Sequence, residues 1–267
     1  MACAAPIDME PLARKLETSG EAGFAKERRG DKETTMLDVV VSCAYGGCHI
    51  PSAYQTDLRP NGEFDRHALA VARALTDDLN APLYASTIAR TLLDVEAPVE
   101  RAVVIDLAEG LHQALLTEYY YPFRRALSND IHEHIATRHR IVHLAIRSVQ
   151  LPGDQLHLVA RSSRSAEWQF VEQWCALLTA PRVGMTVRAL ACDDGHSLQH
   201  ELRLRYAARS YLAVEVRLNR TWLASGHHNS VHLPLVTTLR QLVGAEQPQH
   251  KPMRPLPAGP QAATDPK

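Results

Sequence analysis

Carboxylate and guanidinium side chains follow several of the apolar runs that predict β-strands in this chain. A carboxylate can act as a general base or bind a metal ion, and a guanidinium can hold a ligand carboxylate through two parallel hydrogen bonds. In a parallel sheet the functional residues collect at the carboxyl ends of the strands. This rule selects Tyr45 with Gly46 and Gly47, Asp94 with Glu96, Arg147 with Ser148, and Glu215 with Asn219.

The segments that would position these residues alternate between strands and helices. Apolar runs predict strands over 37–44, 82–87, 90–96, 140–149, 185–192 and 210–219. Helical spacing of apolar residues predicts helices over 65–80, 115–139, 165–180 and 196–209. This alternation predicts an α/β fold, a mainly parallel or mixed sheet covered by helices on both faces.

The composition of the chain limits the classes of function that it can have. The chain has 267 residues, 45% of them hydrophobic, which is enough for one α/β domain. Its 29 basic and 30 acidic residues give a net charge of −1, so we expect no nucleic-acid or membrane partner. Five cysteines without a CxxC pair, and no apolar run long enough for a membrane span or signal, favour a cytoplasmic protein.

The two ends of the chain differ in composition from its middle. Residues 1–36 lack a sustained apolar stripe, so we expect a disordered leader, and Met36 is a plausible alternative start. Residues 245–267 are rich in proline and predict a disordered tail. The folded domain is therefore expected to span 37–244.

Five segments, in order, resemble motifs of the N-formylglutamate amidohydrolase family, whose members look like distant relatives of zinc carboxypeptidases. The segments are SCAYGGCHIP (42–51), RTLLDVEA (90–97), YYYPFR (119–124), HLAIRSV (143–149) and YLAVEVRLN (211–219). The resemblance implies a single hydrolase-like domain of the zinc-carboxypeptidase kind, of phosphorylase/hydrolase-like architecture, with an ancestry in hydrolysis of N-acyl amino acids.

Two departures from these motifs affect the metal site that the resemblance implies. Tyr45 and Arg147 stand where the family has histidines, the natural zinc ligands. A phenol titrates near ~10, and a guanidinium has no lone pair to donate. We therefore expect no bound metal, and we expect Arg147 to pair with Glu96, Asp94 or Glu215 instead.

The motifs assign roles to the remaining positions. We expect Glu215, Arg147, Asp94 and Glu96 to form the catalytic group. The expected ligand is a small carboxylate or an N-acyl amino acid. Residues expected to bind it are Tyr45, Gly46, Gly47, Arg90, Arg124, Ser148 and Asn219.

Three hypotheses remain open on the sequence alone. The first is a degenerate family member that binds its ligand without turnover. The second is an active hydrolase with Glu215 as general base and a metal held by Asp65, Asp94, Glu96, His49 or His143. The third is an interaction module that uses the two tails. Structural roles compete throughout: Gly46-Gly47 as a tight turn, His143 as a hydrogen-bonded core residue, and Arg90 and Arg124 as surface ion pairs.

Overall fold

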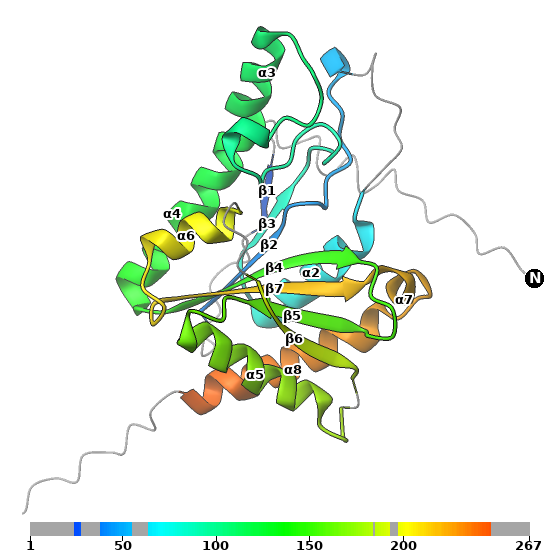
Figure 1. The fold of residues 1–267 in the computed structure, drawn as a ribbon, viewed down its shortest axis with the longest axis vertical. Coiled ribbons are helices and arrows are strands. Elements are labelled where there is room, and N and C mark those ends of the chain that lie inside the picture. Colours follow the sequence, from blue (N-terminus) through cyan, green and yellow to red (C-terminus); the bar gives the residue numbers. More distant parts are fainter. Residues whose placement is uncertain (1–23, 28–37, 55–63, 184, 193–196, 247–267) are drawn as a thin grey trace, which may run out of the picture.

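A computed structural model describes residues 24–27, 38–54, 64–183, 185–192 and 197–246. Within these ranges the chain forms one seven-stranded mixed sheet in the order β1-β3-β2-β4-β7-β5-β6 (Figure 1). The strands are β1 (Phe24–Glu27), β2 (Val39–Cys43), β3 (Leu83–Ser86), β4 (Ile141–Val149), β5 (Leu156–Ala160), β6 (Val187–Ala191) and β7 (Tyr211–Asn219). The predicted fold class is confirmed.

The sheet is parallel in its centre and antiparallel where the edges join it. Strands β3, β2, β4 and β7 run parallel, whereas β5 is antiparallel to β7 and β1 is antiparallel to β3. The strand predicted over 90–96 is wrong: this segment consists of turns with one isolated bridge between Leu93 and Val103. Strand β5, which the sequence analysis did not identify, extends the sheet beyond β7.

Helices cover both faces, as predicted (Figure 1). One face packs against α2 (Arg66–Leu79), α5 (Ser165–Thr179), α7 (Arg220–Ala224) and α8 (His228–Glu246). The other carries α3 (Glu109–Leu115), a π-helical turn (Leu116–Tyr120), α4 (Tyr121–Arg138) and α6 (Leu198–Arg205). Short 3₁₀ turns lie at Ser52–Tyr54 and Val99–Arg101. No helix among the described residues is long and apolar enough to cross a membrane.

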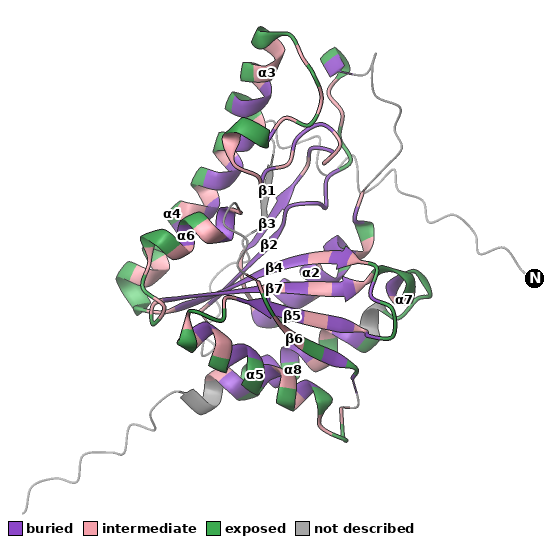
Figure 2. Cartoon of the chain, in the orientation of Figure 1, coloured by how far each residue is buried: buried purple, intermediate pink, exposed green. Residues whose placement is uncertain are grey.

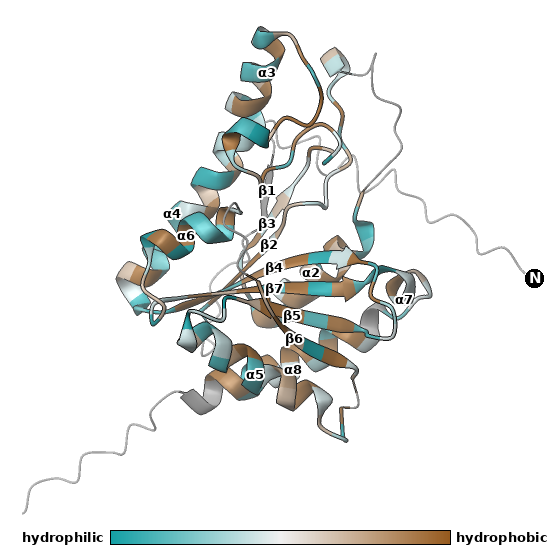
Figure 3. Cartoon of the chain, viewed as in Figure 1, coloured by the Kyte–Doolittle hydropathy of each residue, from teal (hydrophilic) through white to brown (hydrophobic). Residues whose placement is uncertain are grey.

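The two central strands β4 and β7 have faces of different character. On the α2, α5 and α8 side, Leu144 and Ile146 of β4 join Val214 and Val216 of β7 in a buried apolar core (Figure 2). Because successive side chains of a strand point to opposite faces, the residues between them lie on the α4 and α6 side. There the ends of both strands turn polar (Figure 3). This polar stretch of sheet forms the floor of the site described below.

Two described elements extend beyond the limits expected for the folded domain. Strand β1 lies inside the segment expected to be a disordered leader, and it pairs with the edge of β3. At the other end, α8 continues to Glu246, two residues past the expected boundary. Residues 1–23, 28–37 and 247–267, which make up the rest of the predicted leader and tail, lie outside the described residues.

Candidate functional site

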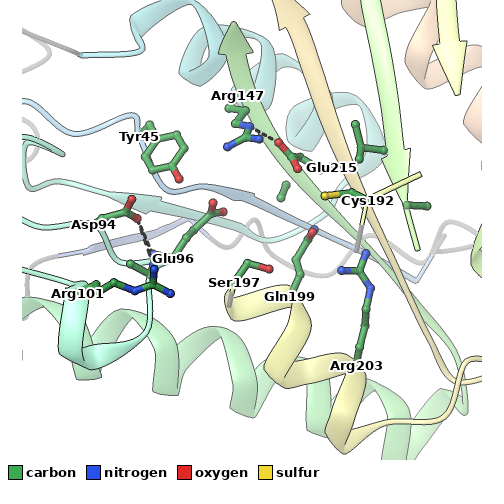
Figure 4. Close-up of a pocket in the computed structure, with 14 residues that line it drawn as sticks. Tyr45, Asp94, Glu96, Arg101, Arg147, Cys192, Ser197, Gln199, Arg203 and Glu215 are labelled. Atoms are coloured by element: carbon green, nitrogen blue, oxygen red, sulfur yellow. Dashed lines mark hydrogen bonds and ion pairs between the residues drawn. The ribbon is translucent and has the colours of Figure 1, made fainter. Parts of the chain in front are cut away.

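A cavity of about 280 Å³ opens over the polar ends of β4 and β7 (Figure 4). Its floor comes from the two strands, one wall from the loop that follows β3, and the opposite wall from the first turn of α6 and the end of β6. The polar side chains that line it are Tyr45, Asp94, Glu96, Arg101, Arg147, Cys192, Ser197, Gln199, Arg203 and Glu215. Four of these were predicted together as catalytic residues, and the structure places all four in this one cavity.

Strand register brings Arg147 and Glu215 together on the floor. Arg147 of β4 lies beside Arg217 of β7, and Ala145 lies beside Glu215. The Arg147 guanidinium forms an ion pair with Glu215. Arg217 also donates from Nε and Nη2 to the two oxygens of Glu215, at 2.8 and 3.1 Å. Both carboxylate oxygens of Glu215 are therefore engaged by arginines, which does not favour the role of general base.

Glu96 is the acid in the cavity that titrates near neutral pH. It is partly buried in the loop after β3, and the Tyr45 hydroxyl donates a hydrogen bond to its carboxylate. Burial, together with the charge of Glu215, raises the pKa of Glu96 to about 7, although the Arg147 charge opposes the rise. Burial likewise raises the pKa of Tyr45 above its usual range, so its phenol stays protonated. Glu96 can thus accept or release a proton near neutral pH.

Tyr45 also forms part of a second, smaller cavity of about 70 Å³, which shares Tyr45 and Arg147 with the first. The Arg90 guanidinium stacks over the Tyr45 ring, 4.1 Å from its centroid, and its Nε lies 3.4 Å from Asp94. Ser148 lines this smaller cavity, and its backbone N–H and hydroxyl donate to Asp65 at 2.5 and 2.6 Å. Arg90 and Ser148, both predicted to bind the ligand, therefore lie behind Tyr45.

The two glycines after β2 serve packing rather than the cavity lining. A Cβ placed on Gly47 would lie 2.3 Å from the Ile88 carbonyl oxygen and 2.4 Å from the Thr87 carbonyl carbon. The two backbone segments are held close together at this point because the His49 N–H donates to the Thr87 carbonyl oxygen at 2.9 Å. Gly46 and Gly47 were predicted to bind the ligand, but neither lines either cavity. The close approach of two backbone segments explains Gly47.

Arg124 and Asn219, also predicted to bind the ligand, have structural partners instead. The buried Arg124 guanidinium donates to the carbonyls of Val95 and Ala97 at 3.1 and 3.0 Å and pairs with Glu201. It thereby fixes the loop that carries Glu96. Asn219 caps α7 by accepting from the Trp222 N–H, and its amide donates to two loop carbonyls. Neither side chain lines either cavity.

Of the candidate metal ligands, Asp94 and Glu96 line the larger cavity, whereas His143, His49 and Asp65 do not. His143 is buried under the sheet, with Nε2 2.8 Å from the Ser42 hydroxyl and Nδ1 2.7 Å from the Tyr211 hydroxyl. Burial lowers its pKa to about 3, so it is a neutral core residue. His49 is exposed beside the β3 loop, and Asp65 caps α2. Within the described ranges, no three His, Cys, Asp or Glu side chains are grouped so that they could hold a metal ion.

Sequence reasoning missed one whole wall of the cavity. Ser197, Gln199 and Arg203 lie on or just before α6, which was predicted as a helix without any functional role. Ser197 caps the helix, with its hydroxyl accepting from the His200 N–H at 3.2 Å. The spacing of Gln199 and Arg203, four residues apart, puts them on the same helix face. This face of α6 packs against β7, which brings both side chains into the cavity, and the sequence alone does not reveal that contact.

Comparison with solved structures supports the predicted fold. Neither protein-family models nor curated proteins match the sequence. Among solved structures, the gene product Atu2144 from Agrobacterium tumefaciens matches with a TM-score of 0.68 and 22% identity over 86% of this chain and 97% of its own. The N-formylglutamate amidohydrolase from Ralstonia eutropha JMP134 matches with a TM-score of 0.66 and 14% identity over 84% of this chain and 99% of its own. As the sequence motifs predicted, this chain has the same fold as an N-formylglutamate amidohydrolase.

Proposed function

We propose that this chain binds an N-acyl amino acid or a related small carboxylate in the larger cavity, with little or no zinc-dependent hydrolysis. The fold is shared with an enzyme named for its action on N-formylglutamate, which supports an amide-containing ligand. The cavity has room for a small molecule and is lined by charged and hydrogen-bonding groups.

The observation that carries this proposal is what surrounds Tyr45 and Arg147, the two positions where the related motifs have histidines. Zinc requires imidazole, thiolate or carboxylate ligands in a tetrahedral arrangement. Instead, the protonated Tyr45 phenol donates to Glu96, and the Arg147 guanidinium pairs with Glu215. These residues do not fit zinc. The Arg147 guanidinium already supplies a positive charge beside Glu215, and the neutral Tyr45 phenol is a hydrogen-bond donor rather than a metal ligand.

Arg101 supports carboxylate binding. It lines the cavity at its exposed rim, and no ion pair to it is found among the described residues. The other cavity arginines are engaged, Arg147 by Glu215 and Arg203 by Glu167. A ligand carboxylate can therefore be held by Arg101 without breaking an existing pair, through charge-assisted hydrogen bonds. We thus give Arg101 the role that the sequence analysis had given to Arg90 and Arg124.

Two measurements on purified protein test the proposal. Metal analysis after expression in zinc-supplemented medium should find well under one zinc per chain, and N-formyl-L-glutamate should not be hydrolysed. Calorimetric titration with the same compound should nevertheless show binding, weakened about ten-fold by Arg101→Gln. Arg138→Gln, which removes an exposed arginine paired with Asp38 outside the cavity, is the control and should bind normally. One tightly held zinc per chain with turnover would overturn the proposal, as would the absence of binding both to N-formyl-L-glutamate and to N-acetyl amino acids with neutral or cationic side chains.

A further inference from the structure

Gln199, which lines the cavity, has a side-chain hydrogen-bond donor without a partner among the described residues. Its side chain is 7% exposed and lines the cavity from the first turn of α6 (Figure 4). Within the described ranges, Nε2 is buried and makes no hydrogen bond. A buried donor without a partner is costly, and such groups in native proteins have an explanation such as a ligand. Nε2 is therefore suited to a carbonyl oxygen supplied by the ligand.

Glu96 offers the opposite kind of group on the facing side. The Leu198 N–H donates to the Glu96 carbonyl at 3.0 Å, which fixes the start of α6 beside the Glu96 loop. The Glu96 carboxylate accepts from the Tyr45 hydroxyl, but among the described residues no lysine, arginine or histidine forms an ion pair with it. Of its neighbours, Asp94 forms an ion pair with Arg90, and Glu215 forms one with Arg147. Glu96 is thus the cavity acid whose charge lacks a direct counter-ion.

We infer that the preferred ligand is an N-acyl amino acid with a cationic side chain, whose acyl carbonyl accepts from Gln199 Nε2 and whose ammonium group pairs with Glu96. This inference rests on the proposed function, because Arg101 is the group that holds the ligand carboxylate. It narrows that function to one substrate class. The three ligand groups then meet three complementary protein groups: a guanidinium, an amide donor and an unpaired carboxylate.

The charged and titratable groups that face Glu96 come from every element around the cavity. They are Tyr45 after β2, Asp94 and Arg101 in the loop after β3, Arg147 of β4, Cys192 after β6, Arg203 of α6 and Glu215 of β7. Arg203 is held by Glu167 through Nε, at 3.0 Å, and by the Ala213 carbonyl through Nη2, at 3.0 Å. With Arg147 and Arg203 committed elsewhere, a ligand cation gives Glu96 its counter-ion.

Calorimetric titrations at pH 8 with three matched compounds test the inference. Nα-acetyl-L-lysine carries all three groups, N-acetyl-L-norleucine lacks the ammonium group, and N-acetyl-L-glutamate replaces it with a carboxylate. The wild type should bind the lysine compound at least ten-fold more tightly than the norleucine compound, and the glutamate compound most weakly. Glu96→Gln, which keeps the size of the side chain, should bring the lysine and norleucine affinities within two-fold of each other.

Two further variants separate the groups. Glu100→Gln removes an exposed acid from the same loop, outside the cavity lining, and should keep the ten-fold preference. Gln199→Leu should weaken all three compounds by a similar factor of about ten, because each has the same acyl carbonyl. Thermal unfolding of each variant shows whether it is folded.

The outcomes distinguish this inference from the function on which it rests. If none of the three compounds binds to the wild type, both fail. If all three bind with equal affinity, or the glutamate compound binds best, the substrate class is wrong and the proposed function stands. A Glu96→Gln variant that keeps the lysine preference would also overturn the assignment of Glu96.

Discussion

At the scale of single residues, burial and neighbouring charge give Glu96 a behaviour that its residue type alone does not. An ordinary glutamate is ionised at neutral pH, whereas the pKa of Glu96 is raised from 4.5 to about 7 by burial and by Glu215. The folded state therefore binds the proton more tightly than the unfolded state does. The stability that this contributes is fully present below about pH 4.5 and is lost as the pH rises through 7.

Glu96→Gln should consequently stabilise the protein more at high pH than at low pH. Glutamine resembles the protonated acid and can still accept the Tyr45 hydrogen bond. At pH 8 we expect the free energy of unfolding to exceed that of the wild type by about 1–2 kcal/mol, less than the full shift implies because the carboxyl group is only partly buried. At pH 4, below both the unfolded and the folded pKa of Glu96, the difference should nearly vanish. Urea unfolding at both pH values, with Glu100→Gln as control, measures this, and a pH-independent difference would contradict it.

At the scale of elements, the turn after β2 is defined by the backbone that it passes. The Gly47 Cα faces the Thr87 and Ile88 backbone, which cannot move aside as a flexible side chain can. Gly46 instead faces Cys43 and Leu69 side-chain atoms, at 3.2 Å, which can shift by a few tenths of an ångström. The turn therefore holds β2 and the loop after β3 together, and that loop carries Asp94 and Glu96.

Gly47→Ala and Gly46→Ala should differ sharply for this reason. The Gly47 variant should lose about 3 kcal/mol of stability, a cost typical of overpacking against an unyielding neighbour, and its ligand affinity should fall as the Glu96 loop shifts. The Gly46 variant should lose under about 1 kcal/mol. Chemical denaturation of both measures the difference, and equal losses would show that the turn does not depend on the crossing at Thr87.

The sequence predicted the elements better than the side-chain contacts between them. Apolar runs over 140–149 and 210–219 predicted β4 and β7, and they also put Arg147 and Glu215 on strands that proved to be neighbours. The resemblance of RTLLDVEA to a strand motif misled, because this segment forms turns held by Arg124. Gln199 could not have been found, since nothing in a predicted amphipathic helix distinguishes a glutamine facing solvent from one facing a cavity.

At the scale of the whole molecule, a strand from the N-terminal part of the chain forms one edge of the sheet. Composition set aside residues 1–36, yet Phe24–Glu27 form β1 and pair with all four residues of β3. The pairing of β1 covers the edge of β3, which would otherwise be open to another chain.

Two truncations distinguish the contribution of β1 to stability from that of the residues before it. Deleting residues 1–22 keeps β1 and should leave the melting temperature unchanged. Deleting residues 1–35 should leave a folded domain, because the other six strands of the sheet and the helices that cover them are kept, but lower the melting temperature by about 3–6 °C for the loss of about 1–2 kcal/mol. The exposed β3 edge should also make the shorter chain associate as its concentration rises, which light scattering would detect. If the two truncations melt together and both stay monomeric, β1 has no part in holding the sheet, and the domain is complete from Met36 onward.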